Sequence, residues 1–200
     1  KGIYTEKPFA RTMEECDQIE KVCQKSGTKI AVAHRNRYHP ALPVVSQLIE
    51  EGAIGKVVAL HGRGKEDHRG GGEDLWVLGT HVFDLVNAIA GDPVSCSAEL
   101  RINGKLVQKK DIHPGNEGLG PLAGDEVHAR WRMSNGWTFS FSSIRNRGLK
   151  QANFGLQIIG NEGIIDLRCD REPFAHLREG CPWSPSDKPT EWKPISSLGI

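Results

Sequence analysis

The chain has 200 residues, with 26 basic and 25 acidic side chains, a formal net charge of +1 and 38% hydrophobic residues. The length allows one large domain or two small ones. The balanced charge argues against a nucleic-acid partner, which usually leaves a basic patch, and no apolar run approaches the roughly 20 residues that span a bilayer. Five widely spaced cysteines predict neither a zinc site nor a disulfide framework, and favour a reducing, cytoplasmic setting.

The first forty residues predict one strand–helix–strand unit. Residues 2–5 form a short expected strand, and a helix is expected from an N-cap at Thr12 to Gly27. The stretch "TKIAVAH" at 28–34 predicts a second strand, apolar enough to be buried on both faces. Such a unit implies a parallel sheet. Because one strand pair does not form a stable sheet, residues 1–40 are expected to be the end of a larger domain.

After this unit, the pattern becomes that of an α+β domain, expected over 41–200. A helix is predicted over 41–51, a long strand over 54–67 and a second helix over 74–90. Before the second helix, "HRGGG" at 68–72 predicts a mobile or tightly turning loop.

The rest of the chain is predicted to be mostly antiparallel strands, over 94–102, 125–133, 137–145, 153–160 and 163–168. The stretches "SNG" at 134–136 and "GNEG" at 160–163 predict β-hairpin turns. The polar segment 103–124 is too long for a simple connection and is expected to be functional or disordered. Residues after 171 show no period.

Lys7 is the first candidate for a chemical role, because it follows the carboxyl end of a strand, where open α/β sheets bind ligands. Pro8 restricts Lys7 to extended conformations and would aim its amine consistently. An aimed, desolvated lysine can polarise a hydroxyl or a carbonyl. A solvated lysine beside Glu6 at a strand end explains the same residues.

His81, in "GTHVFDL", is the second candidate. It lies off the predicted core-facing stripe of its helix, and an ordinary pKa near 6.5 suits a general acid or base. Asp84, three residues later, could orient the ring or raise its basicity. A histidine satisfied by that aspartate at a packed surface is the alternative. The glycines of "GGG" would let backbone approach a ligand closely.

Further polar side chains are candidates for binding a substrate. In "HRNRYHP", His34, Arg35 and Arg37 could bind a phosphate or carboxylate or hydrogen-bond sugar hydroxyls, and a basic surface at a domain junction explains them equally well. His68 and Arg69 allow the same two interpretations. No pair of His or Cys has the spacing of a structural zinc site, so no metal is predicted.

The order of these motifs resembles the Gfo/Idh/MocA oxidoreductases, the glucose-fructose oxidoreductase and inositol dehydrogenase group. The resemblance covers about residues 3–168 and rests on Glu6-Lys7-Pro8, "RNRYHP", "EEGAIGKV" and "GTHVFDL". It implies an N-terminal Rossmann domain that binds NAD or NADP, of which residues 1–40 would be the last part. A C-terminal substrate and oligomerisation domain with an open, mostly antiparallel sheet would follow over 41–200.

The resemblance also implies roles for single residues. Lys7 matches the lysine that contacts cofactor and substrate, with Glu6 and Pro8 beside the cofactor, and His81 matches the base toward the substrate hydroxyl. The other candidates would bind substrate: Arg35, Arg37, His68, Arg69 and Asp84. The expected reaction is oxidation of a sugar, polyol or related carbohydrate with NAD or NADP. A homo-oligomer through the open sheet is expected, and alternating apolar residues predict a sheet face that needs covering: Val127, Ala129, Trp131 and Met133.

One position departs from the family pattern. Many members carry an aspartate four residues before the helix histidine, where this chain has Val77, which cannot share a proton. Asp74 is about 10 Å from His81 along a helix axis and is no direct substitute. Two alternatives therefore stay open: a redox-neutral glycoside cleavage or epimerisation through transient oxidation, and a non-catalytic oligomerisation domain in the isolated chain.

Overall fold

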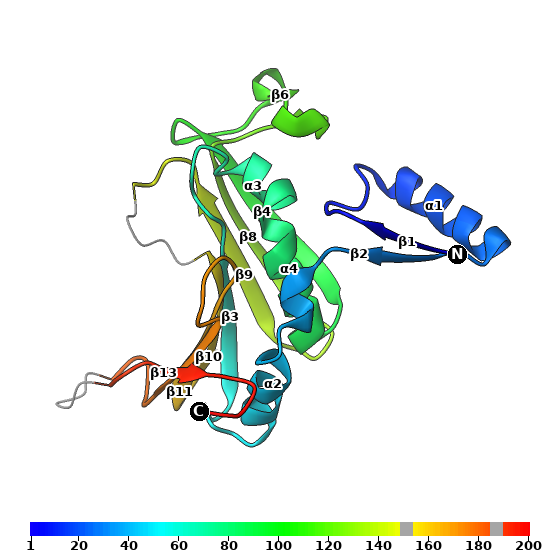
Figure 1. The fold of residues 1–200 in the computed structure, drawn as a ribbon. Coiled ribbons are helices and arrows are strands. Elements are labelled where there is room, and N and C mark those ends of the chain that lie inside the picture. Colours follow the sequence, from blue (N-terminus) through cyan, green and yellow to red (C-terminus); the bar gives the residue numbers. More distant parts are fainter. Residues whose placement is uncertain (149–153, 185–189) are drawn as a thin grey trace.

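The computed structural model describes residues 1–148, 154–184 and 190–200, and places a small strand–helix–strand unit beside one large sheet (Figure 1). The small unit contains β1 (Gly2–Thr5), α1 (Met13–Ser26) and β2 (Lys29–Val32), with its two strands paired in parallel as predicted. The Thr12 hydroxyl caps α1 by accepting a hydrogen bond from the amide of Glu15 (3.2 Å). Gly27 ends the helix at φ 66°.

The prediction that the second strand is buried on both faces is wrong. Residues of β2 alternate between exposed and half-buried. Among the described residues, β1 is the only strand that pairs with β2, and α1 is the helix that lies along the pair (Figure 1). One face of the pair is therefore left open.

The chain then passes through the 3₁₀ helix η1 (Arg35–Tyr38), α2 (Leu42–Glu50) and β3 (Val57–Arg63). The strand predicted over 54–67 is shorter, because the backbone turns after Arg63 and Glu66 adopts a positive φ of 58°. Two helices follow, α3 (Gly72–Val77) and α4 (Gly79–Ala90). The single helix predicted over 74–90 is therefore wrong: the helix starts earlier and breaks at Leu78.

Nine strands form the large sheet in the order β13-β12-β11-β10-β3-β9-β8-β4-β5, and all neighbours are antiparallel except β3 and β9. The remaining strands of this sheet are β4 (Pro93–Ile102), β5 (Lys105–Leu106), β8 (Glu126–Met133), β9 (Thr138–Ile144), β10 (Gly155–Gly160), β11 (Gly163–Arg168), β12 (Ala175–Glu179) and β13 (Lys193–Ile195). The predicted fold class, an α/β chain with an open, mostly antiparallel sheet, is confirmed. The strands β12 and β13 were not predicted, because they are short and their sequences do not alternate. Residue 153, the predicted start of one strand, lies outside the described residues.

Both predicted hairpin turns are confirmed, and a third was overlooked. The turns "SNG" and "GNEG" join β8 to β9 and β10 to β11. Asn103 and Gly104, with φ of 50° and 73°, join β4 to β5, an Asn-Gly signal that the sequence carried. The segment 103–124 is folded and includes η2 (Lys109–Asp111), β6 (His113–Pro114), η3 (Asn116–Gly118) and β7 (Pro121–Leu122).

The helices α2, α3 and α4 lie on one face of the large sheet, with the core between them (Figure 1). Each fully buried apolar side chain there contributes about 1.5–3 kcal/mol to stability. The strand β8 faces this core with Val127, Ala129 and Met133 buried, while Trp131 packs on Phe83 of α4. The prediction that this apolar face needs covering is therefore confirmed, and the cover is a layer of the chain's own helices.

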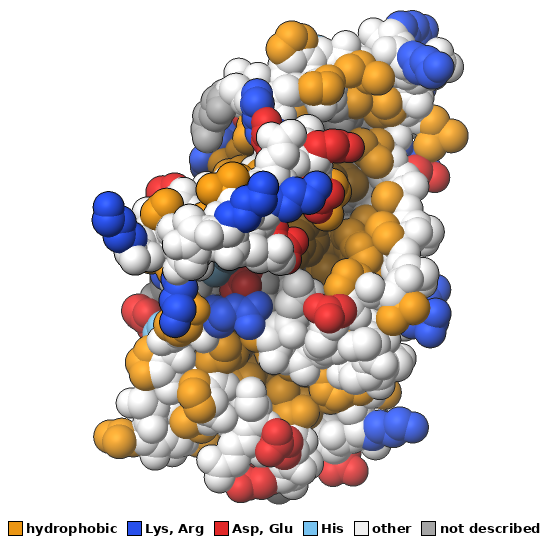
Figure 2. Space-filling view, turned by 90° about the vertical axis from the view of Figure 1, so that its right-hand side faces the viewer, with side chains coloured by type: hydrophobic (Ala, Val, Ile, Leu, Met, Phe, Trp, Pro, Cys, Tyr) orange, Lys and Arg blue, Asp and Glu red, His pale blue; other side chains and the backbone are white. Residues whose placement is uncertain are grey.

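The other face of the sheet is polar and carries a hollow of about 780 Å³. Its lining includes His61, Arg63, Glu99, His128 and Arg130. A smaller hollow of about 210 Å³ beside α4 is mainly apolar and includes Phe83 and Trp131 in its lining. Seen from the side of α1, the molecule has a concavity where hydrophobic side chains gather (Figure 2). No helix in the described part of the chain is long and apolar enough to cross a membrane.

Candidate active site

Lys7 and His81 are brought to the same place by a break in the helical segment. The Nζ of Lys7 donates a hydrogen bond to the carbonyl oxygen of Val77 at the end of α3 (2.5 Å). In a continuous α-helix that carbonyl would accept from the amide of His81. Here the amide of His81 donates to Leu78 instead (3.1 Å), so the Val77 carbonyl is available to the ammonium group. A helix C-terminus is also partially negative, which favours a cation.

The ring of His81 is half-buried between two other rings. His34, at the end of β2, lies edge-on with its centroid 6.1 Å away, and Phe154, just before β10, lies at 6.4 Å. The Nδ1 atoms of His81 and His34 are buried, and neither has a hydrogen-bond partner among the described residues. Buried polar atoms are normally paired. These two nitrogens are therefore exceptions to that rule within the described part of the chain.

The surroundings of His81 favour its neutral form. Burial is the main cause that lowers its pKa, and the positive charges of Lys7, His34 and Arg35 add to this, which brings the pKa to about 4. The negative charge of Asp84 opposes the shift as the weakest of these influences. At neutral pH the ring is unprotonated and can accept a proton.

Asp84 is bound by Arg37 rather than by His81. Its Oδ1 accepts hydrogen bonds from Nε and Nη2 of Arg37 (2.8 and 2.6 Å), and its carbonyl oxygen also accepts from Nη2 (3.0 Å). The hydrogen bond to the His81 ring that sequence suggested does not form. The Arg37–Asp84 pair instead joins η1 to α4 and so fixes the helix that carries His81.

Arg35 is the first residue of η1 and is exposed. Its Nη2 donates to the carbonyl oxygen of Cys169 (3.1 Å), which follows β11. Arg35 also lines a hollow of about 520 Å³ between residues 35–40 and 168–174. The site therefore includes the Cys169 carbonyl and the Phe154 ring, which sequence reasoning missed because neither belongs to a recognisable motif.

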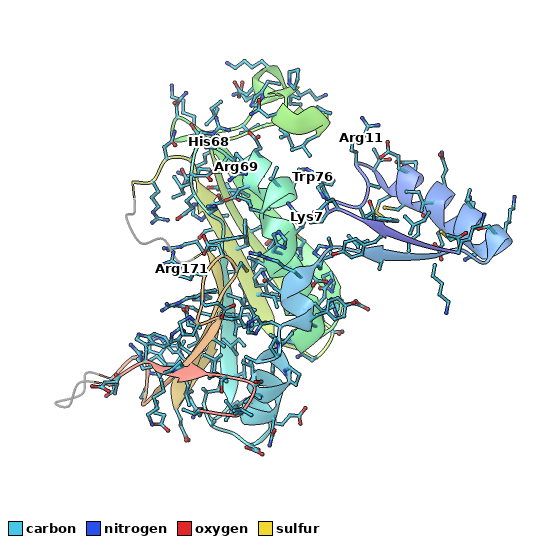
Figure 3. The ribbon with its side chains drawn as sticks, viewed as in Figure 1. Lys7, Arg11, His68, Arg69, Trp76 and Arg171 are labelled. Carbon is cyan, nitrogen blue, oxygen red and sulfur yellow. The ribbon has the colours of Figure 1, made fainter. Side chains whose placement is uncertain are left out.

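His68 and Arg69 are not brought to this place. Arg69 pairs with Asp67 through Nη2 and Oδ2 (2.7 Å), which lowers the pKa of Asp67 to about 2, and His68 is exposed beside the same carboxylate. The amide of Asn146, after β9, donates to the carbonyl of Asp67 (3.0 Å). Figure 3 shows His68 and Arg69 apart from Lys7, with α3 between them.

The three glycines approach the protein's own backbone, not a ligand site. A Cβ on Gly72 would lie 2.2 Å from the carbonyl oxygen of Ala123, and one on Gly70 would lie 2.3 Å from the Cα of Arg145. Below them, Asp74 is fully buried and accepts a hydrogen bond from the hydroxyl of Ser143 (2.6 Å), and burial raises its pKa. Within the described residues, no group of three or more His, Cys, Asp or Glu is arranged to hold a metal ion.

The family model described as the GFO/IDH/MocA C-terminal domain matches residues 44–166. The chain therefore belongs to the Gfo/Idh/MocA family, as the motifs indicated.

Two curated relatives carry names of sugar dehydrogenases. The levoglucosan dehydrogenase of Pseudarthrobacter phenanthrenivorans is 26% identical over 198 residues, which is 86% of this chain and 50% of that protein. A D-xylose dehydrogenase of Paenarthrobacter nicotinovorans is 34% identical over 62 residues, 31% of this chain and 16% of that protein. A solved levoglucosan dehydrogenase in complex with NADH and levoglucosan has a TM-score of 0.68 at 25% identity, covering 100% of this chain and 60% of that one. The chain thus spans about half the length of the first of these curated relatives.

Proposed function

We propose that this chain is part of an NAD(P)-dependent oxidoreductase that oxidises a hydroxyl of a sugar, polyol or related carbohydrate. The convergence of the Lys7 amine and the neutral His81 ring beyond the carboxyl end of β1 carries this proposal. Support also comes from the family match and from relatives named as sugar dehydrogenases, one of them solved with NADH and a sugar.

We assign residues 1–40 to the last part of a Rossmann domain and residues 41–200 to the substrate and oligomerisation domain. The parallel pair β1–β2 and the family match that begins at residue 44 support this division. Residues Glu6, Lys7 and Pro8 would lie beside the cofactor. His34, which follows β2, brings its ring 6.1 Å from the ring of His81 on α4 and so places the strand ends beside the proposed base. The five free cysteines agree with a cytoplasmic protein.

The proposed chemistry places the substrate hydroxyl between Lys7 and His81. The neutral ring of His81 takes the hydroxyl proton, and the ammonium group of Lys7 stabilises the alkoxide that develops. One N–H of Lys7 is held by the Val77 carbonyl, which leaves two for the substrate. The O–H electrons form the new C=O bond as the carbon releases its hydrogen with two electrons. NAD or NADP, when bound, supplies the acceptor for that hydride.

The test uses the full-length protein with NAD⁺ or NADP⁺ and a panel of sugars, and follows the absorbance of the reduced nicotinamide together with the sugar products. His81→Asn should lower turnover by roughly 10²- to 10⁴-fold, the usual range for an acid–base group. His113→Asn, an exposed histidine in β6, is the control and should keep its rate. An unchanged rate in His81→Asn would remove the histidine from the mechanism.

A redox-neutral reaction is the second candidate, and Val77 is the observation that favours it. The side chain at the end of α3 is apolar and 4% exposed, so it offers no proton to share. A relative named 2,7-anhydro-N-acetylneuraminate hydratase from Escherichia coli is 30% identical over 61 residues, 30% of this chain and 16% of that protein. A changed sugar without lasting absorbance would identify this reaction. The isolated chain is expected to be inactive and to show no measurable affinity for NAD. A micromolar Kd for NAD would contradict this expectation.

A further inference from the structure

The positive charges around His81 are not balanced by carboxylates. Lys7 reaches the end of α3, four residues before His81, and Arg35 directly follows His34, whose ring lies 6.1 Å from the ring of His81; the charge of each lowers the pKa of His81. Each makes its hydrogen bond to a backbone carbonyl, of Val77 and Cys169 respectively. Neither forms an ion pair in the described parts of the chain. A carbonyl dipole orients a cation but does not neutralise its charge.

Nearly every neighbouring carboxylate already has its own cation. On α4, Asp84 is held by Arg37 at 2.6 Å. Beyond β11, Asp170 pairs with Arg171 at 3.5 Å, and Glu172 pairs with His39 at 3.1 Å when that ring is protonated. The chain at the end of α3 offers only the apolar side chain of Val77.

The loop after β1 adds one more acid, Glu6, which is exposed next to Lys7. It faces solvent, where its attraction to Lys7 is screened. The place where the substrate hydroxyl is proposed to lie is therefore bordered by two cations without a paired anion.

We propose that the substrate is an acidic carbohydrate, a sugar or polyol with a carboxylate group, and that Arg35 binds this carboxylate while the reacting hydroxyl lies between Lys7 and His81. This assignment rests on the proposed function and adds the substrate class to it. The guanidinium of Arg35 has five N–H donors, and its bond to the Cys169 carbonyl leaves enough of them for a bidentate contact with a carboxylate. Arg35 lines a hollow of about 520 Å³ together with Arg171 and the paired acids Asp170 and Glu172, so there is open space beside its guanidinium.

Two alternative roles for Arg35 predict different effects of its removal. If it only ties η1 to the segment after β11, its removal lowers stability and leaves the choice between acids and neutral sugars unchanged. If it binds a phosphate of the cofactor, its removal raises the KM for NAD⁺ or NADP⁺. Lys7 alone is sufficient to stabilise an alkoxide, so the reaction itself does not require a second cation.

The experiment compares acids with neutral molecules of nearly the same shape. The full-length protein is titrated, in the presence of NADH so that no turnover occurs, with D-glucuronate, D-galacturonate and their methyl esters, and with D-gluconate against D-glucitol. Binding is read from the NMR signal of the His81 ring and from calorimetry. Turnover with NAD⁺ or NADP⁺ is measured on the same compounds at about 20 mM and 300 mM salt.

We expect at least one acid to bind about ten-fold or more tightly than its neutral counterpart, with kcat/KM for that acid falling as salt screens the attraction. Arg35→Gln should raise the KM for the acid by roughly 10- to 100-fold and change kcat by less than about two-fold, because a charge-assisted bidentate contact is lost at a distance from the reacting hydroxyl. Arg11→Gln removes an exposed arginine that pairs with Glu15 on α1, and should leave both constants unchanged.

The outcomes separate this assignment from the proposed function. Oxidation of neutral sugars as fast as acids, without a salt effect, overturns the acidic substrate and leaves the oxidoreductase standing. Acids that bind through Arg35 but are never oxidised uphold the contact between Arg35 and the carboxylate and overturn the proposed function. A raised KM for the cofactor in Arg35→Gln, with the preference between acid and ester intact, also overturns the assignment.

Discussion

At the scale of single residues, the basicity of His81 is set by burial first and by the charge of Lys7 second. Lys7→Gln keeps a side chain of similar length and removes the charge, so the pKa of His81 should rise from about 4 toward its ordinary value. An NMR titration of the histidine ring protons measures this pKa directly. Arg11→Gln removes a charge that pairs with Glu15 on α1 and is not among the charges that act on His81, so it should leave the pKa of His81 unchanged. Equal pKa values in the wild type and Lys7→Gln would place Lys7 too far away to act on the base.

The lowered pKa of His81 also makes stability depend on pH. The unfolded chain binds a proton near pH 6.5, whereas the folded ring binds it only near pH 4. Between these values the unfolded state holds more protons, so the free energy of unfolding is highest above pH 6.5 and falls as the pH drops toward 4. His61 and His176, whose pKa values burial also lowers, act in the same direction.

Urea unfolding at pH 7 and pH 5 tests this dependence. The urea concentration at the midpoint of unfolding should be lower at pH 5 than at pH 7 for the wild type. The difference between the two midpoints should be smaller in His81→Gln, because glutamine does not titrate. His113→Gln, which replaces an exposed histidine, is the control and should keep the full difference. A His81→Gln variant with an undiminished difference would show that the acid sensitivity arises elsewhere.

At the scale of elements, the start of α3 is held by close packing of Gly71 and Gly72 on residues 123–125, the connection between β7 and β8. The α-carbon of Gly72 has no room for a methyl group, because a Cβ would lie 2.2 Å from a backbone oxygen that cannot swing away. Gly72→Ala should therefore cost about 3 kcal/mol, the upper end for overpacking. It should also lower turnover, since α3 carries the Val77 carbonyl that holds Lys7.

The matched control for this change is Gly104→Ala in the turn between β4 and β5. A Cβ there meets nothing within 4 Å, but φ is 73°, so only the left-handed backbone opposes the substitution. Its cost should be about 1 kcal/mol, without loss of turnover. Chemical denaturation of both variants gives the comparison. Equal costs would mean that the contact with Ala123 relaxes easily.

The elements also show which parts of the site could be predicted from sequence. Lys7 and His81 were predictable because each stands in a short motif at a strand end or on a helix face. The break in the helix at Leu78 could not be predicted, because the stretch "LWVLGTH" keeps an apolar helical pattern across it. Gly79 is the one residue in this stretch that disfavours a continuous helix. Without the break, the amide of His81 would also bond the Val77 carbonyl, and Lys7 would have to share that oxygen.

Pairing between residues that are distant along the chain could likewise not be predicted from the sequence. Asp84 lies three residues from His81 and was expected to bind it, but Arg37 supplies a planar pair of donors from another element. Local spacing predicts contacts within a helix and not competition from outside it. The same limit explains the sheet face: the alternation in β8 was correct, while the helices that cover Val127 and Met133 come from a different stretch of chain.

At the scale of the whole molecule, the two faces of the large sheet differ in what covers them. The apolar face packs against α2, α3 and α4, and the polar face has no layer over it in the described parts of the chain (Figure 1). Nine strands spaced about 4.8 Å apart give a surface roughly 40 Å wide. With strands of about 20 Å, this surface approaches the roughly 800 Å² per partner of a stable interface. We therefore propose that this polar face forms the contact of a homo-oligomer.

Ser97 on β4 lies in the hollow of this face, opposite Arg130 of β8. A substitution at Ser97 therefore tests whether this face forms the contact. Ser97→Arg adds a large cation beside Arg63 and Arg130, so a partner that packs on the face should be repelled and displaced. Light scattering after gel filtration should show the full-length protein as an oligomer at micromolar concentration and the variant at the monomer mass. Gln47→Arg adds the same charge on α2, behind the opposite face, and should leave the mass unchanged. A wild type that is monomeric, or an oligomer that survives Ser97→Arg with its mass intact, would show that this face is not the interface.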